Sequence, residues 1–91
     1  MRTITLADGT VFEVTECGAY DGKLWITTTA ELDFITGVTV FGDAEKTITI
    51  THDYDGNDHV IFEGYTILKQ ASVLEGGFTV VLEKEKETDD E

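Results

Sequence analysis

The stretch Ile4-Thr5-Leu6-Ala7-Asp8-Gly9-Thr10-Val11-Phe12-Glu13-Val14 gives the clearest indication of the fold. Apolar and polar residues alternate on both sides of the Asp8-Gly9 pair, which is a frequent hairpin turn. This alternation puts apolar side chains on one face of a strand and polar side chains on the other. The stretch therefore predicts a half-buried antiparallel hairpin whose inner face carries Ile4, Leu6, Phe12 and Val14.

The same alternation recurs between short turn sequences in the rest of the chain. We expect residues 17–22 and 42–46 to be connectors and Gly64 to mark a bend, since glycine inside a strand often accompanies a bulge. Residues 84–91 have no apolar side chain and are expected to form an acidic, disordered tail after a single domain over residues 1–83. Further strands are predicted over residues 23–29, 38–41, 47–52, 59–64, 65–73 and 78–83.

Residues 30–36 fit two descriptions. Thr29 can cap a short helix that carries Leu32 and Ile35 on one side. Alternatively, residues 31–35 form a short strand that is separated from the next one by Gly37. The fold class is predicted to be all-β, a small antiparallel sandwich or barrel of six to seven short strands, with or without one short helix around residues 30–36.

The composition limits the classes of partner. The chain has 91 residues, 19 acids and 6 bases, which give a formal net charge of −13. A negative field repels phosphate groups and anionic lipids, so we expect no direct binding to nucleic acid or to a membrane. The first residues lack an apolar stretch of signal-peptide length, which argues against secretion by that route.

The turn around residues 53–58 is the best candidate for a metal site. Asp53, Asp55 and Asn57 offer three oxygen ligands in a tight turn, which would make a weak cation site. His52 and His59 flank the turn and would add two imidazoles if they faced each other. The simpler interpretation is a hairpin turn rich in residues that tolerate positive φ. We predict neither a metal nor another cofactor.

Two residues qualify as candidate nucleophiles. Cys17 is the only cysteine and Ser72 the only serine, and neither lies in a recognisable nucleophile motif. A lone Cys17 is more simply a small buried apolar residue. We therefore predict no catalytic residues and a protein that is not an enzyme.

The aromatic residues indicate a candidate protein interface at Tyr20, Trp25 and Tyr65. If Leu24 and Ile26 face inward, Trp25 faces outward, where a large aromatic side chain can anchor a partner. The alternative is a central strand that is buried on both faces.

Several short segments carry a family resemblance. They are Phe41-Gly42-Asp43, Lys46-Thr47-Ile48 and residues 4–10, 62–68 and 78–84. Together they resemble small proteins of unknown function that are encoded in prophages of Gram-positive gut bacteria, among genes for virion structure. The resemblance implies a location in the cytoplasm of a bacterial host or in a virion, and it implies no catalytic residue.

Two functions follow as hypotheses. The first is a non-enzymatic phage or prophage structural or accessory protein that assembles with other proteins or with itself as a homo-oligomer. The alternative is an acidic nucleic-acid mimic that inhibits a host nucleic-acid-binding enzyme. In that case phosphate groups would be imitated by Asp53, Asp55, Asp58 and Glu63.

Overall fold

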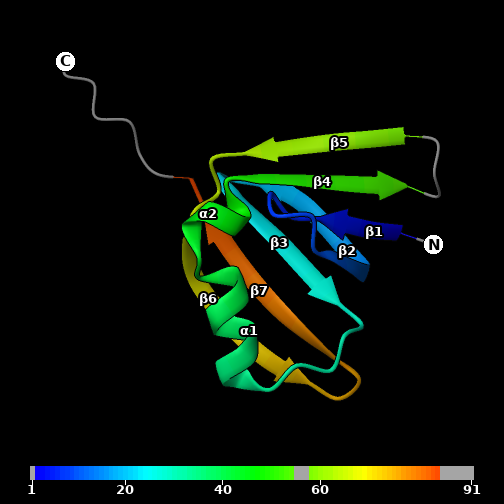
Figure 1. The fold of residues 1–91 in the computed structure, drawn as a ribbon, viewed down its shortest axis with the longest axis vertical. Helices are drawn as coiled ribbons and strands as arrows, with labels where there is room; N and C mark the ends of the chain where they lie inside the picture. The colour runs from blue at the N-terminus through cyan, green and yellow to red at the C-terminus, as the bar shows by residue number, and fades with distance from the viewer. Residues whose placement is uncertain (1, 55–57, 85–91) are drawn as a thin grey trace.

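The computed structural model describes residues 2–54 and 58–84 (Figure 1). Within these residues the chain forms seven strands and two short helices. All of the strand pairs are antiparallel, which confirms the predicted all-β fold. The elements follow in the order β1 (Arg2–Thr5), β2 (Val11–Tyr20), β3 (Lys23–Thr28), α1 (Phe34–Phe41), α2 (Ala44–Thr47), β4 (Thr49–Tyr54), β5 (Asp58–Glu63), β6 (Ile67–Leu74) and β7 (Gly77–Glu83).

The strands form one sheet in the order β5-β4-β1-β2-β3-β7-β6. The long strand β2 joins its two halves, because its beginning pairs with β1 and its later residues pair with β3. A register shift between Val14 and Glu16 marks the change, and such a bulge bends a strand and increases its twist. Strands β4 and β5 consequently run at a clear angle to β3 and β7 (Figure 1).

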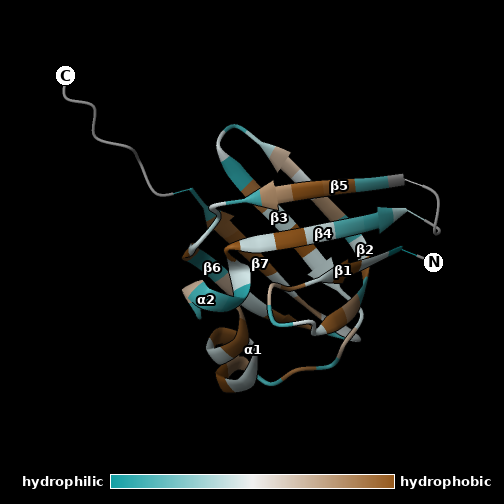
Figure 2. Ribbon diagram, turned by 45° about the horizontal axis from the view of Figure 1, so that its top comes forward, coloured by the Kyte–Doolittle hydropathy of each residue, from teal (hydrophilic) through white to brown (hydrophobic). Residues whose placement is uncertain are grey.

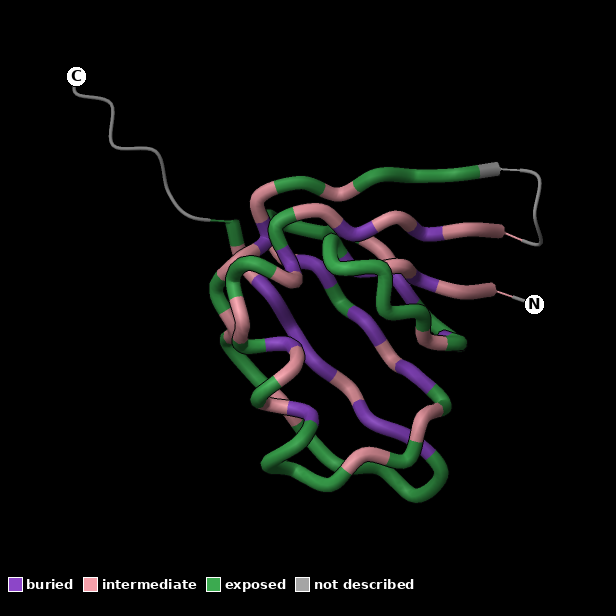
Figure 3. The backbone as a smooth tube through the Cα atoms, in the orientation of Figure 1, coloured by how far each residue is buried: buried purple, intermediate pink, exposed green. Residues whose placement is uncertain are grey.

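Both halves of the sheet contribute to one hydrophobic core. Ile4 and Ile50 come from one half, and Leu24 and Val80 come from the other. Figure 3 shows buried positions concentrated along β3 and β7, the strands in the middle of the second half. The apolar residues of the alternating strands thus face the core. Its buried members are Ile4, Leu6, Val14, Cys17, Leu24, Ile26, Phe41, Ile50, Tyr65, Phe78, Val80 and Leu82.

Helix α1 corrects the prediction of a strand over residues 38–41. The helix begins after Asp33, whose carboxylate accepts a hydrogen bond from the backbone N–H of Thr36 at 2.7 Å. Thr29 is therefore not the cap. Gly37 lies within the helix and therefore does not separate two strands. The ring of Phe78 occupies the space that a side chain at position 37 would need, which explains the glycine. The eight residues of α1 carry no charge, and the helix is white to brown in the hydropathy colours of Figure 2. The helix packs against β6.

Two predicted connectors also contain regular structure. Residues 17–20 extend β2, and only Asp21 and Gly22 form the turn, with φ values of 56° and 78°. Positive φ at both central residues is typical of a type I′ hairpin turn. Residues 44–47 form α2. Gly64 has a φ of 86° and lies between β5 and β6, which are at opposite edges of the sheet, so the residues around it do not form the expected continuous strand with a bend.

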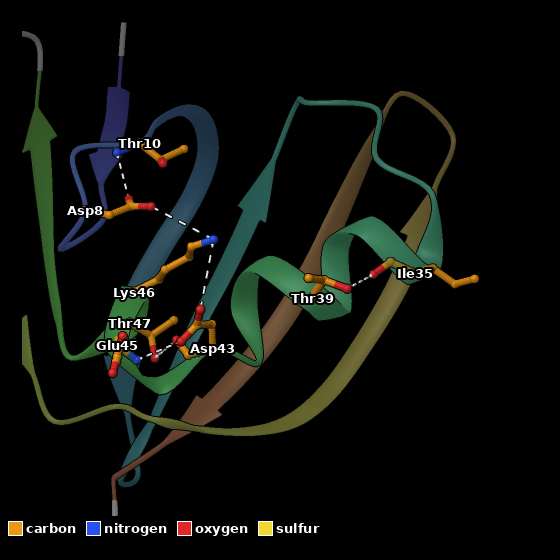
Figure 4. Close-up of polar contacts among 8 residues, drawn as sticks. All are labelled: Asp8, Thr10, Ile35, Thr39, Asp43, Glu45, Lys46 and Thr47. Atoms are coloured by element: carbon orange, nitrogen blue, oxygen red, sulfur yellow. Dashed lines mark hydrogen bonds and ion pairs between the residues drawn. The ribbon is translucent and has the colours of Figure 1, made fainter.

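Polar contacts connect the first hairpin to α2 (Figure 4). Asp43 caps α2 by accepting the backbone N–H of Glu45 at 3.0 Å. The Lys46 ammonium lies 4.0 Å from carboxylate oxygens of both Asp8 and Asp43. Asp8 in turn accepts the N–H of Thr10 at 3.0 Å. Hydrogen bonding from the side chain of Thr10, and secondly from its backbone, lowers the pKa of Asp8. The side chains of this cluster are about one-third exposed, so the ion pairs contribute little stability.

Candidate functional site

The outer face of β3 carries the candidate interface. Leu24 and Ile26 are fully buried, so the intervening Trp25 points away from the core, as predicted. Trp25 is 43% exposed, and Tyr20 on the neighbouring strand is 75% exposed. Such large exposed aromatic side chains are frequent anchors of protein interfaces.

The neighbours of Trp25 leave a hollow on each side of it. Trp25 pairs with Gly18 on β2 and with Val81 on β7. A hollow of about 340 Å³ lies on the Gly18 side and also reaches Arg2, and one of about 380 Å³ lies on the Val81 side. Gly18 has open space where a side chain would be. We call Gly18, Tyr20, Trp25, Gln70 and Val81 the Trp25 surface.

Charges around the second hollow balance one another. The ammonium groups of Lys23 and Lys69 lie 3.6 and 3.8 Å from the carboxylate of Glu83. Two bases, Lys23 and Lys69, and one acid, Asp21, line this hollow, and Glu83 adds a second acid through its pairs with the two lysines, in a chain whose net charge is −13. The Trp25 surface is therefore suited to contacts between aromatic and apolar groups, with little net electrostatic repulsion at its rim.

Tyr65 does not belong to this surface, which corrects the predicted interface. It is only 8% exposed and belongs to the core. Its ring lies edge-on to Phe62, with the centroids 6.1 Å apart, and the Lys84 ammonium lies 5.5 Å from its centroid. Tyrosine occurs both at interfaces and in cores, so its identity alone does not distinguish the two.

Cys17 is buried, as its interpretation as a small apolar residue predicts. Burial raises the pKa of its thiol to about 12, and the opposing effect of the Arg2 charge is smaller. Only the thiolate is a good nucleophile, so Cys17 has little reactivity near neutral pH. Ser72 is exposed on β6 and lies outside both hollows.

The two histidines do not face each other across the β4–β5 hairpin. His52 points into the protein, whereas the Nδ1 of the exposed His59 lies 3.3 Å from a carboxylate oxygen of Asp53. Neighbouring residues of a strand alternate between faces, which separates the two imidazoles. Asp55 and Asn57 lie outside the described residues, so the predicted cation turn and the mimic alternative stay predictions. Among the described residues, no cluster of three or more potential metal-binding side chains is present.

His52 is fully buried, and neither ring nitrogen has a hydrogen-bond partner among the described residues. Its ring centroid lies 4.1 Å from that of Tyr54. Burial is the main cause that lowers the pKa of His52, and the positive charge of Arg2 adds to it. The negative charge of Asp53 acts in the opposite direction.

This buried imidazole predicts a loss of stability in acid. At a pH above the ordinary pKa of about 6.5, His52 is neutral in both the folded and the unfolded chain, so it does not change the free energy of unfolding. At a pH below this value, the imidazole of His52 binds a proton in the unfolded chain but not in the folded chain, which favours unfolding. Each unit by which the folded pKa is lowered should then cost about 1.4 kcal/mol. Urea unfolding at pH 7.5 and 5.5 measures this loss. His52→Leu should reduce it, whereas a similar reduction in the exposed control His59→Gln would contradict the assignment.

In the described parts of the chain, neither helix has the length and hydropathy needed to span a membrane. Comparisons of the sequence and structure with models of protein families, with curated proteins and with solved structures find no match.

Gly18, Gln70 and Val81 belong to the Trp25 surface but are not predicted by the sequence. The sequence predicts a connector at Gly18, whereas the tight Asp21-Gly22 turn leaves Gly18 at the end of a strand. Val81 became recognisable only through its pairing with Trp25, because that contact joins strands far apart in the sequence.

Proposed function

We propose that this protein is a non-enzymatic assembly protein that binds copies of itself through the Trp25 surface. The proposal includes the structural or accessory role in a phage or prophage that the family resemblance implies. The observation that supports self-assembly most directly is the exposure of Trp25 and Tyr20 between two hollows. Burying such aromatic side chains against another protein provides much of the binding energy in typical interfaces.

Self-assembly through this surface should persist at high salt. Each copy carries a charge of −13, so two copies repel each other at low ionic strength. Raising the salt concentration from about 0.1 M to 1 M shortens the Debye length from about 10 Å to about 3 Å, which screens this repulsion. An acidic mimic would instead release its basic partner as salt is added.

Trp25→Ala should weaken self-association roughly 30-fold, which corresponds to about 2 kcal/mol for the loss of an interface anchor. Light scattering over a concentration series, in about 0.1 M and 1 M NaCl, measures the native mass. The matched control is Phe34→Ala, which removes an exposed aromatic side chain from α1 instead. A wild-type chain that stays monomeric in both salts would exclude self-assembly. A stronger effect of Phe34→Ala than of Trp25→Ala would place the interface elsewhere.

A further inference from the structure

In the part of the chain that the structure describes, one edge of β2 has no partner strand over half of its length. Strand β1 pairs only with residues 11–13 of β2. Beyond the bulge, Glu16 to Tyr20 pair with β3 on the opposite edge. Within the described residues, no strand pairs with the other edge of residues 16–20, and the hollow of about 340 Å³ runs beside it.

The adjacent hairpin determines which backbone groups face this open edge. A two-residue turn closes on a hydrogen-bonded pair, which here is Tyr20 with Lys23. Hydrogen-bonded and non-hydrogen-bonded pairs alternate along an antiparallel ladder. Gly18 therefore bonds to Trp25, whereas Cys17 and Ala19 direct their N–H and C=O groups away from β3. These four groups are available to another strand.

Residues 17–19 of the open edge carry no lysine, proline or charged side chain, and the bulge of β2 lies before them, between Val14 and Glu16. Proteins protect edges with lysine, proline, bulges or inward-pointing charges. The outer edge strand β6 has such protection, because Lys69 lies at a register shift between Leu68 and Gln70. By contrast, residues 17–19 of β2 are Cys, Gly and Ala, whose small side chains allow a second backbone to approach.

We infer that a second copy of the chain pairs with this edge, antiparallel and about a two-fold axis at Gly18. This inference rests on the proposed self-assembly and specifies its geometry. In this register Gly18 lies opposite Gly18 of the partner subunit. Cys17 lies opposite Ala19 of the partner subunit, and Ala19 lies opposite Cys17 of the partner subunit. Each of these two pairs forms two backbone hydrogen bonds, which makes four in total. The same patch serves both copies, as a closed two-fold dimer requires.

The register also avoids contact between like charges. Glu16 lies opposite Tyr20 of the partner subunit, and the two Glu16 carboxylates are far apart along the strands. Beyond that position, Asp21 of the partner subunit approaches Arg2, whose Nη1 already donates to the carbonyl of Thr15 next to the edge. An acidic chain thus meets its own copy through an acid–base pair at each end of the paired segment.

The dimer also accounts for the hollow beside Trp25. Glu16, Gly18 and Tyr20 alternate with Cys17 and Ala19, so they share the outer face with Trp25. Tyr20 of the partner subunit is diagonal to Gly18, a distance that aromatic side chains can span. Its ring can occupy the open space over Gly18 and contact the indole of Trp25. The two exposed aromatic residues would then cover each other across the two-fold axis.

A disulfide at the axis tests this geometry. Non-hydrogen-bonded pairs have Cα atoms about 4.5 Å apart, which lies within the range of disulfides. In a Cys17→Ala background, Gly18→Cys should form a covalent dimer in oxidised glutathione. The new side chain meets nothing within 4 Å in the monomer, so the fold should tolerate it. The matched control Glu16→Cys lies on the same strand and face, but its two copies would be about 14 Å apart.

Gly18→Cys is expected to cross-link at least tenfold faster than Glu16→Cys, as measured on non-reducing gels. In the wild-type dimer, the amides of Cys17 and Ala19 should exchange with deuterium more slowly than in the diluted monomer. An oligomer that shows neither result would overturn pairing at this edge and leave self-assembly intact. A chain that is monomeric at every concentration would overturn both proposals.

Discussion

Replacing Phe78 by alanine should lower the free energy of unfolding by about 4 kcal/mol. Phe78 is fully buried in β7. Its ring stacks on Phe41 of α1, with the centroids 6.4 Å apart and the planes inclined by 11°. The substitution removes this contact and leaves a cavity between helix and sheet. A domain of this size has a total stability of about 5–14 kcal/mol, so the variant loses a large part of it.

Urea unfolding followed by circular dichroism, at a concentration where the chain is monomeric, measures the loss. Phe34→Ala is the matched control, because Phe34 is an exposed phenylalanine near the start of α1. We expect it to change the stability by less than about 1 kcal/mol. Equal losses in the two variants would contradict the position of Phe78 at the centre of the core.

Gly37→Ala should lower the free energy of unfolding by about 2 kcal/mol, even though alanine favours a helix more than glycine does. A Cβ atom at position 37 would collide with the ring of Phe78. Because that ring is buried on all sides, it cannot move aside without disturbing β7. The helix would therefore have to separate from the sheet.

A double-mutant cycle isolates this contact. Phe78→Leu removes the ring that collides with the new methyl group and should recover at least 1 kcal/mol of the Gly37→Ala loss. Urea unfolding of the two single variants and the double variant gives the coupling energy. If the losses in free energy of unfolding of the two single variants add up to that of the double variant, the new methyl group does not act through the Phe78 ring. A Gly37→Ala variant that is more stable than the wild type would contradict the close contact.

The strands were largely predictable because their signals are local. Alternation places Ile4, Leu24 and Val80 inward without reference to any other strand, and the structure buries all three. The same rule predicts the outward direction of Trp25. The Asp8-Gly9 and Asp21-Gly22 pairs supply the positive φ values that tight turns need, at φ 93° for Gly9 and 78° for Gly22.

The helix over residues 34–41 was not predictable in this way. Its β-branched residues favour a strand, and Gly37 resembles a break between two strands. Two features stabilise the helix, namely the cap at Asp33 and the packing of Phe41 and Gly37 against Phe78. Packing overrides local preference here, because the buried contact is worth more than the propensities of a few residues.

By itself, the sequence determined the all-β class, the main turns, the inward and outward faces of the strands and the net charge, since each depends on neighbouring residues only. The tertiary structure alone decided that α1 covers the sheet, that Tyr65 belongs to the core and that Trp25 lies between Gly18 and Val81. It also decided that, among residues 2–54 and 58–84, no strand pairs with one edge of residues 16–20 of β2. These features depend on contacts between residues far apart in the sequence, and such contacts arise only when the bulge in β2 brings the two halves of the sheet around one core.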